Sequence, residues 1–534
     1  MKFNFTFERI EKIKPSQLFV FLLVLAGAVY SLLGFQGTLY FDDAFYIQGG
    51  RFIVEGTPPY ASFLATKTPL SQFIAAFALL LGRKFGAGDI LSVRIIFFIL
   101  SSLGAASIYL LGRQLFDSNR LGIIACLTFL GFYGFGRHAA SGPRPKGPLI
   151  LFESLTLFLA ARRDWFWSAF FGGLMTLTWQ PTLIYPAFVI YLSFVQSPAG
   201  EERKKNLGRA AAGFSLPILV LSAYMLKKGA FRQMIKDTLY YPVTLLERGS
   251  NTFSQRLLQP ILTVELDYTD MSLPILLGFV MMIVLIVWRL SAHQYKLKDF
   301  INQDPLAALS VTFSVLVVWS ILDFQGFADL YILLPGLALG FAWMVELLVA
   351  GISSQKETAN ISILVFIFVC LSLAGFAGRL YTRNSNNVLE KQTAVAEKIA
   401  ERYLQDPDDY IFTVGVVSYH VLIDSRHSGR YFNLIDAQNK VIEHEYPGGF
   451  KKWMKDNMSG DPAAIIVGNI LPDSLESWVH EYIQDHGYRL DDSFVFAKEI
   501  RPAHVKTWIR QHRRGVTILE SERMDWKIYI PVEK

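Results

Sequence analysis

Residues 39–50 read LYFDDAFYIQGG and directly follow a long apolar run. Asp42 and Asp43 therefore stand side by side at the point where a transmembrane helix should leave the bilayer. An ionisable side chain at that depth is costly, which makes it a candidate functional residue by default. The segments on either side of this pair decide what it could do.

The composition is typical of an integral membrane protein. Hydrophobic residues make up 52% of the chain and charged residues 18%, whereas soluble domains carry roughly a quarter charged residues. The net charge of +6 is spread in short clusters between apolar runs, a pattern that indicates membrane topology and gives no reason to expect nucleic acid as a partner. Cys126 and Cys370 both lie inside apolar runs, so neither a disulfide framework nor a cysteine metal site is predicted.

Two stretches decide the number of spans. Residues 70–84 have an apolar core of about a dozen residues, short of the roughly twenty that a span needs, so we expect an interfacial helix there. Residues 165–196 are too long for one helix and predict a hairpin that turns at Gln180–Pro181. The sequence then predicts about eleven spans, at 17–36, 90–112, 121–136, 148–161, two within 165–196, 210–226, 272–290, 306–322, 330–350 and 360–380.

The distribution of Lys and Arg supports this count. With these spans, most basic clusters between helices fall on the same side as the basic amino terminus, which the positive-inside rule places in the cytoplasm. The first run has no small-residue cleavage site after it, so we expect a retained helix rather than a signal peptide. The carboxy-terminal tail then lies outside, with the Asp42 loop.

From Ser385 the sequence becomes polar. Residues 388–404 have helical periodicity, and YIFTVGVV (410–417) and AAIIVGN (463–469) are typical of short buried strands. We therefore predict a transmembrane domain over residues 1–384 and an extracytoplasmic α/β domain with a mostly parallel sheet over residues 385–534. No Gly-rich loop opens a helix there, so a lid or docking role is expected rather than a nucleotide site.

Residues 41–70, FDDAFYIQGGRFIVEGTPPYASFLATKTPL, resemble the first outer loop of the GT-C glycosyltransferases that use polyprenyl-phosphate sugars, such as protein O-mannosyltransferases and aminoarabinose transferases. Asp42 stands where that family has its catalytic Asp, and Asp43 replaces the usual Glu. The other matching positions are Tyr46, Gly56, Pro59, Tyr60, Lys67 and Pro69. The resemblance implies a membrane all-α fold with interfacial helices in this loop, followed by an outer soluble domain.

Two segments depart from the family pattern. Many members have a second Asp in the turn after the third span. In GRHAASGPRPKGP (136–148) the ionisable residues are two Arg, one Lys and one His, and there is no acidic residue. LTWQPTL (177–183) lacks the Lys that many members have near the fifth span. The two-carboxylate form of the family mechanism and the identity of the sugar therefore stay open.

The resemblance implies transfer of a monosaccharide, mannose by default, from a polyprenyl phosphate to a hydroxyl of a protein, lipid or glycan acceptor. Asp42 is the candidate base, and attack with a single base predicts inversion. No cofactor is required, although Asp43 could help to hold a divalent cation. Cations would stabilise the departing phosphate, and the candidates are Lys67, Arg137, Arg144 and Lys146.

The expected location is a bacterial plasma membrane, with the catalytic face outside. Further candidate substrate contacts are Tyr46, Tyr60, His138, Trp179, Gln180, Asp329 and Tyr331. Simpler roles compete with these: the Asp pair could cap a helix, and the basic turn could bind anionic lipid headgroups. Trp179 could belong to the aromatic belt. For the whole chain, a transporter or flippase of lipid-linked saccharide and a non-catalytic scaffold remain alternatives.

Overall fold

The computed structural model describes most of the chain from Glu8 to Val532. The residues it describes are 8–497 and 524–532, with gaps at 33–34, 62, 140–141, 246–255, 258–259, 262, 265–267, 269–270, 323–326, 351–372, 374–387, 426–429, 432–433, 435, 459–460 and 469–472.

The chain divides into two units, and each combines segments that are far apart in sequence. Unit 1 comprises Met1–Phe35, Arg94–Ala223 and Gly249–Ser385. Unit 2 comprises Gln36–Val93, Tyr224–Arg248 and Asn386–Lys534. The loop that carries the acidic pair therefore folds with the carboxy-terminal tail.

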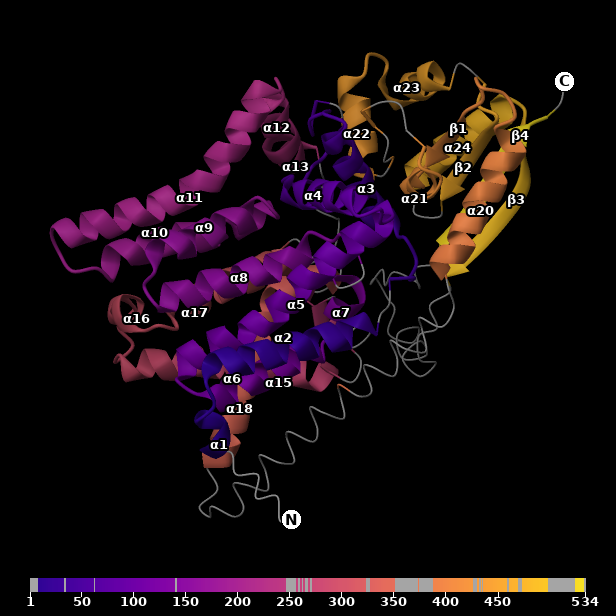
Figure 1. Cartoon of the computed structure of the whole chain (residues 1–534). Coiled ribbons are helices and arrows are strands. Elements are labelled where there is room, and N and C mark those ends of the chain that lie inside the picture. The colour runs from indigo at the N-terminus through magenta and orange to yellow at the C-terminus, as the bar shows by residue number, and fades with distance from the viewer. Residues whose placement is uncertain are drawn as a thin grey trace, which may run out of the picture. The chain divides into compact units, whose positions relative to one another are not determined.

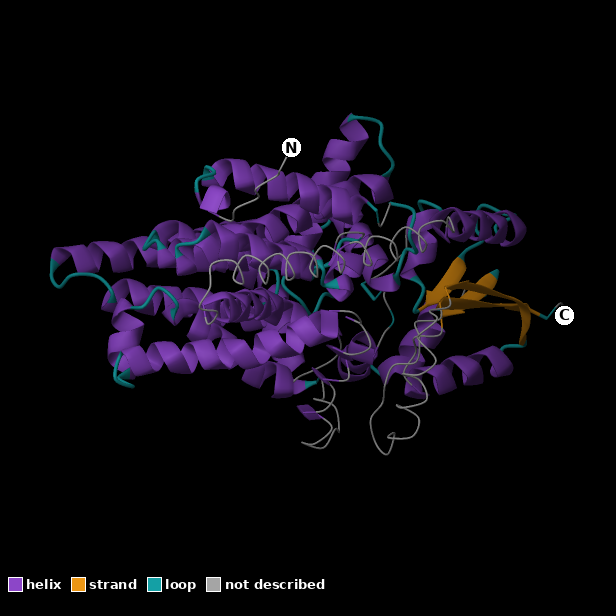
Figure 2. Cartoon of the chain, turned by 90° about the horizontal axis from the view of Figure 1, so that it is seen from below, coloured by secondary structure: helices purple, strands orange, loops and turns teal. Residues whose placement is uncertain are grey.

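Unit 1 consists of helices that run largely side by side (Figures 1 and 2). They are α1 (Glu8–Glu11), α2 (Pro15–Ser31), α5 (Asp89–Phe116), α6 (Asn119–Leu130), α7 (Tyr133–Ala139), α8 (Lys146–Ala161), α9 (Trp165–Thr176), η1 (Gln180–Leu183), α10 (Ile184–Val195), α11 (Glu201–Lys227), α15 (Ser272–Ala292), α16 (Leu297–Gln303), α17 (Ala307–Leu322), η4 (Phe327–Leu333) and α18 (Leu334–Ala350). The first residues of α5 and the last of α11 belong to unit 2.

The predicted membrane all-α architecture is confirmed. Each predicted span among the described residues overlaps a helix, although 121–136 is divided between α6 and α7. Of the predicted span 360–380, the structure describes only Leu373. The run 165–196 forms the expected hairpin of α9 and α10, with η1 at its turn. Four described helices are long and apolar enough to cross a membrane by themselves, namely Asp89–Phe116, Glu201–Lys227, Ser272–Ala292 and Asp329–Val349. Shorter apolar helices are Pro15–Ser31, Asn119–Leu130, Gln180–Val195 and Ala307–Leu322.

Glycines bring two of these helices into backbone contact. A Cβ atom at Gly278 of α15 would lie 2.2 Å from the carbonyl oxygen of Leu337 in α18. A Cβ atom at Gly340 of α18 would lie 2.3 Å from the carbonyl oxygen of Gly278. Small residues at helix interfaces are the usual way for membrane helices to pack closely, because lipid gives them little hydrophobic driving force to associate.

Unit 2 contains the first loop, a short middle segment and the tail. Its elements are α3 (Phe41–Val54), α4 (Leu70–Lys84), α12 (Phe231–Ile235), the π-helix η2 (Lys236–Tyr240), α13 (Tyr241–Thr244), α20 (Val388–Tyr403), β1 (Ile411–Val414), α21 (Val417–Leu422), α22 (Asp436–Glu445), α23 (Gly449–Asn457), β2 (Ala464–Gly468), α24 (Asp473–Asp485), β3 (Tyr488–Ala497) and β4 (Met524–Pro531). At 15 residues, α4 is shorter than a bilayer requires.

The glycine pair of the opening stretch explains how α3 packs on α4. A Cβ atom at Gly49 would lie 3.1 Å from the side chain of Gln72, and one at Gly50 would lie 3.0 Å from the backbone nitrogen of Ala76. Both glycines are buried. Bulkier residues at either position would push the two helices of the loop apart.

The tail contains one four-stranded sheet with the order β1-β2-β4-β3. β1 and β2 are parallel, whereas β4 is antiparallel to both β2 and β3. The prediction of a mostly parallel sheet is therefore wrong. β1 is buried and apolar apart from Thr413, and β2 is apolar and buried up to Gly468, as the sequence suggested. β3 carries charged residues and exposes Leu490 and Val495, so its apolar pattern is weak.

Helices cover both faces of this sheet (Figure 2). Successive strand residues point to opposite faces, so Phe412 packs with Trp453 of α23 on one face. Ile411 packs with Ile399 of α20 on the other face. The partly buried Tyr40, which directly precedes α3, joins this second core. The tail core thus extends to the residue before the acidic helix.

Candidate functional site

Asp42 and Asp43 lie in the first turn of α3. Asp42 is partly exposed, whereas Asp43 is buried with 4% of its surface accessible. The positive end of the helix dipole favours negative charge at these positions. A carboxylate that keeps contact with solvent at a helix start is placed to accept a proton, so Asp42 is the better candidate of the two for a base.

The simpler interpretation of the pair as helix caps does not fit this geometry. The N-cap residue of α3 is Tyr40, whose side chain makes no capping hydrogen bond. Asp42 and Asp43 follow inside the helix rather than in the capping position, where Asp is favoured. The interaction with the helix dipole remains as a structural contribution of each carboxylate.

A strained tyrosine organises the turn that carries Lys67. Tyr60 has a φ of 70°, an uncommon value for a residue with a side chain. Its backbone N–H donates to the carbonyl of Phe63 at 2.9 Å, and its hydroxyl donates to the carbonyl of Lys67 at 3.0 Å. Tyr60 is fully buried while Lys67 is exposed. Tyr46 is also buried and packs edge-to-face on Phe45 at 5.3 Å.

Three of the predicted site residues of unit 1 converge on one cation. Lys146, at the start of α8, forms an ion pair with Asp329 of η4. Its ammonium nitrogen also lies 4.6 Å from the ring centroid of Trp179, a cation–π contact. Lys146 is 9% exposed. Gln180 follows Trp179 as the first residue of η1.

The basic turn is tied to η4 at a second point. The hydroxyl of Tyr331 donates to the carbonyl of Gly134 in α7 at 2.6 Å, and the Tyr331 ring packs edge-on against Phe135 at 5.2 Å. Arg137 and His138 belong to the same helix, but their side chains lie outside the described part of the structure. Arg144 donates its backbone N–H to the carbonyl of Gly142 at 2.8 Å.

Sequence reasoning missed a buried ionic cluster in unit 2. The carboxylate of Asp237 in η2 is fully buried. It accepts a hydrogen bond from the guanidinium of Arg430 at 2.8 Å and another from the side-chain amide of Gln233 at 2.6 Å. The neighbouring Lys236 pairs with Glu445 of α22. Burial raises the pKa of Asp237 to about 7, although the charge of Arg430 opposes the shift. No motif marks these residues, because their partners lie about two hundred positions away.

A buried carboxyl inside the helices of unit 1 was also missed. Glu153 of α8 accepts a hydrogen bond from the hydroxyl of Tyr185 in α10 at 2.6 Å, and both residues are buried. Ionisable groups within spanning helices are rare and normally face a partner in the helix bundle, as here. As for metals, the described residues contain no group of three or more His, Cys, Asp or Glu side chains that could hold an ion.

Comparison with known proteins shows what this chain is similar to. Residues 66–241 match the model of the dolichyl-phosphate-mannose-protein mannosyltransferase family. The apo structure of ArnT from Cupriavidus metallidurans aligns with a TM-score of 0.55 at 13% identity, covering 96% of this chain and 97% of that chain. In its fold and in this matched segment, the chain is similar to glycosyltransferases of the GT-C superfamily. No curated protein sequence matches it.

Other solved structures are similar to this chain. ArnT from Cupriavidus metallidurans bound to undecaprenyl phosphate aligns with a TM-score of 0.55 at 13% identity, covering 95% of this chain and 97% of that chain. The Archaeoglobus fulgidus oligosaccharyltransferase aligns with a TM-score of 0.48 at 13% identity, covering 84% and 68%. The alignment with ArnT covers nearly the whole of this chain. The glycosyltransferase class predicted from the Asp42 loop is confirmed.

Proposed function

We propose that this GT-C glycosyltransferase transfers a monosaccharide from a polyprenyl phosphate to an acceptor hydroxyl on the extracytoplasmic face of a bacterial plasma membrane. The observation that carries the proposal is the partly exposed Asp42 in the first turn of α3, at the start of a loop of the family type. The fold shared with ArnT bound to undecaprenyl phosphate supports a polyprenyl-phosphate carrier. Mannose is the first sugar to test, because the matched family model is that of mannosyltransferases.

The proposed reaction needs one base and one anionic leaving group. Asp42 takes the proton of the acceptor hydroxyl while the oxygen of that hydroxyl attacks the anomeric carbon of the donor sugar. The bond from that carbon to the phosphate oxygen breaks, and the polyprenyl phosphate leaves with the electron pair. Because nucleophile and leaving group are on opposite faces of the sugar, the anomeric configuration inverts, by analogy with inverting glycosidases.

The departing phosphate requires positive charge rather than a proton. Lys67 is exposed on the turn organised by Tyr60, so we propose it as one contact to the donor phosphate. Lys146, Arg137 and Arg144 are the other proposed contacts. Since Lys146 is paired with Asp329, a phosphate that binds Lys146 must compete with that carboxylate.

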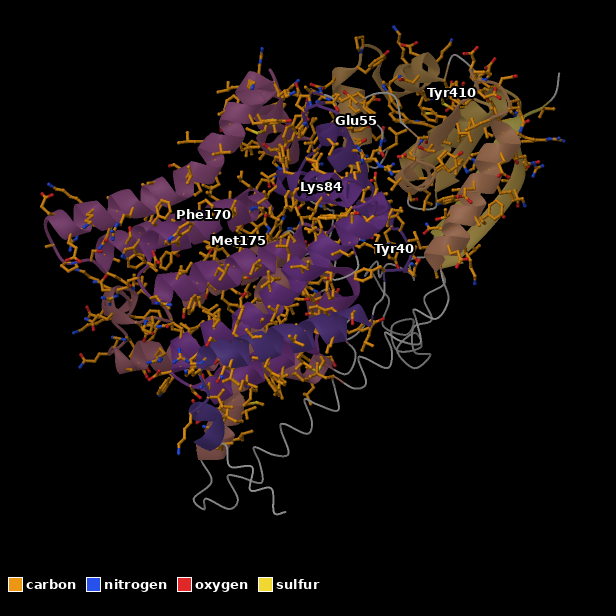
Figure 3. All side chains as sticks on the ribbon, in the orientation of Figure 1. Tyr40, Glu55, Lys84, Phe170, Met175 and Tyr410 are labelled. Carbon is orange, nitrogen blue, oxygen red and sulfur yellow. The ribbon has the colours of Figure 1, made fainter. Side chains whose placement is uncertain are left out.

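Transfer of label from polyprenyl-phosphate sugars tests the proposal. Purified protein is incubated in detergent with radiolabelled donors, with and without a divalent cation, and with protein, lipid and glycan acceptors. We expect Asp42→Asn to abolish transfer while the protein still folds, since the lost interaction with the helix dipole costs only about 0.3–1 kcal/mol. The control is Glu55→Gln, which removes an exposed carboxylate at the other end of α3 (Figure 3) and should leave transfer intact. Full activity of Asp42→Asn would exclude this base.

The same assay addresses the alternatives. A lipid-linked saccharide that crosses a reconstituted bilayer with its sugar still attached to the lipid would favour a transporter. Protein that binds the donor without either outcome would favour a scaffold. The acceptor that gains the label identifies the acceptor class.

A further inference from the structure

The acidic helix α3 is held by the carboxy-terminal tail at its amino end. The side chain of Gln392 in α20 is fully buried and pairs with the backbone of Leu39 in both directions. The Leu39 N–H donates to Gln392 Oε1 at 2.9 Å, and Gln392 Nε2 donates to the Leu39 carbonyl at 3.2 Å. Leu389 adds a backbone hydrogen bond to the carbonyl of Gln36 at 3.0 Å.

These contacts fix the residues just before the acidic pair. A side-chain amide can bind the backbone N–H and the backbone C=O of one residue at the same time, as a paired β-strand does. Two such hydrogen bonds fix the orientation of that residue as well as its position. Leu39 is fully buried and is followed by Tyr40, which packs into the tail core next to α20 (Figure 3). Asp42 is only two residues further on.

The carboxy end of α3 is held by a second contact with the tail. Arg51 is 6% exposed, and its guanidinium donates to the carbonyls of Val421 at 3.2 Å and His420 at 3.4 Å, near the end of α21. A cation is favoured at the negative end of a helix. The same guanidinium contacts the carboxylate of Asp89 at 2.9 Å and the exposed Asp424 at 3.1 Å.

We propose that the tail is a positioning element for the base, and that Gln392 and Arg51 are its positioning residues. This inference rests on the proposed function of Asp42. Neither residue need touch a substrate, since each holds one end of the helix that carries the base. A shift of about 1 Å in a reacting group can reduce the rate about a hundredfold, so loss of either contact should reduce catalysis far more than donor binding.

The first test replaces Gln392 by Met, which has a similar length but makes neither hydrogen bond. We expect kcat to fall by about a hundredfold, with an unchanged KM for the polyprenyl-phosphate sugar. Amide hydrogen exchange over residues 37–50 should accelerate. The control is Glu397→Ala on the exposed side of the same helix, which should change neither quantity.

The second test uses Arg51→Lys, which keeps the charge but cannot donate in the planar, forked geometry of a guanidinium. Its matched control is Arg83→Met, because Arg83 shares the contact with Asp89 at 3.2 Å and the charge of Asp424, but is not described as a donor to the carbonyls of His420 and Val421 that bind Arg51. We expect Arg51→Lys to lower kcat and to accelerate exchange at the carboxy end of α3, and Arg83→Met to do neither. If Gln392→Met fails to fold, this milder pair provides the same measurements.

The outcomes separate this inference from the proposed function. If the native protein transfers no sugar, the proposed function fails, and the exchange measurements alone decide whether the tail holds α3. Unchanged exchange over residues 37–50 in both variants would overturn the inference. Unchanged kcat in an active enzyme, or a loss that resides entirely in the donor KM, would overturn it as well.

Discussion

The buried carboxyl of Asp237 should make the stability of unit 2 depend on pH. Its pKa is raised from 3.8 to about 7 by burial, so the folded state binds the proton more tightly than the unfolded chain. The stability due to this group is therefore fully present below about pH 4 and is lost as the pH rises through about 7. Each pKa unit corresponds to about 1.4 kcal/mol, so the full change is about 4 kcal/mol.

Replacement by asparagine isolates this contribution. Asp237→Asn keeps an oxygen that can accept from Arg430 and from Gln233, but it does not titrate. Thermal unfolding of both proteins in detergent is followed between pH 4.5 and pH 8. As the pH rises, the thermal unfolding midpoint of the wild type should fall relative to that of the variant, by roughly 10 °C at most for a unit of this size.

The direction of the change is decisive, because Arg430 and burial act in opposite directions on Asp237. Glu445 adds to the effect of burial, whereas the amide of Gln233 favours the charged form. If the wild type instead gains stability relative to Asp237→Asn between pH 4.5 and pH 8, the ion pair outweighs burial. A difference that does not vary with pH would show that Asp237 does not titrate in this range in the folded state.

Two further pairs of variants test the cation cluster and the packing. Lys146→Met should raise the donor KM and also lower the thermal midpoint, since it removes the ammonium group from the ion pair with Asp329, a loss of about 3–5 kcal/mol for a buried pair. Adding Asp329→Leu should restore the midpoint but not the KM, whereas recovery of both would assign Lys146 a purely structural role. Gly50→Val should destabilise the protein by about 1–3 kcal/mol, because its side chain would meet the backbone of Ala76. Gly37→Ala, where the added atom meets nothing within 4 Å, is the control, and equal melting of the two variants would contradict the packing argument.

Features with a strong local signal were predicted from the sequence. Apolar runs of bilayer length predicted the helices of unit 1. The turn at Gln180 was predicted because the apolar run that contains it is too long for one membrane-spanning helix. The short core of residues 70–84 indicated a helix that does not span, and α4 has 15 residues. The strands β1 and β2 were found because each is a continuous buried apolar run.

Features that depend on pairing across the chain were not predicted. β3 and β4 stabilise each other by antiparallel pairing, and their polar outward faces hide the alternation. Gln392 lies in a helix with clear amphipathic periodicity, but its partner Leu39 is 353 residues away. A buried Gln or Arg carries no local pattern, so only the folded chain shows which backbone groups it satisfies.

Arg430 joins all three segments of unit 2. Its carbonyl accepts the N–H of Leu64 from the first loop at 2.9 Å, while its guanidinium donates to Asp237 from the middle segment at 2.8 Å. The turn with Lys67 is therefore fixed to the tail near Arg430, and the helix with Asp42 is fixed to it through Gln392. Because both candidate groups are held by the same tail, changes at these contacts should not be independent, and their effects on kcat should combine non-additively.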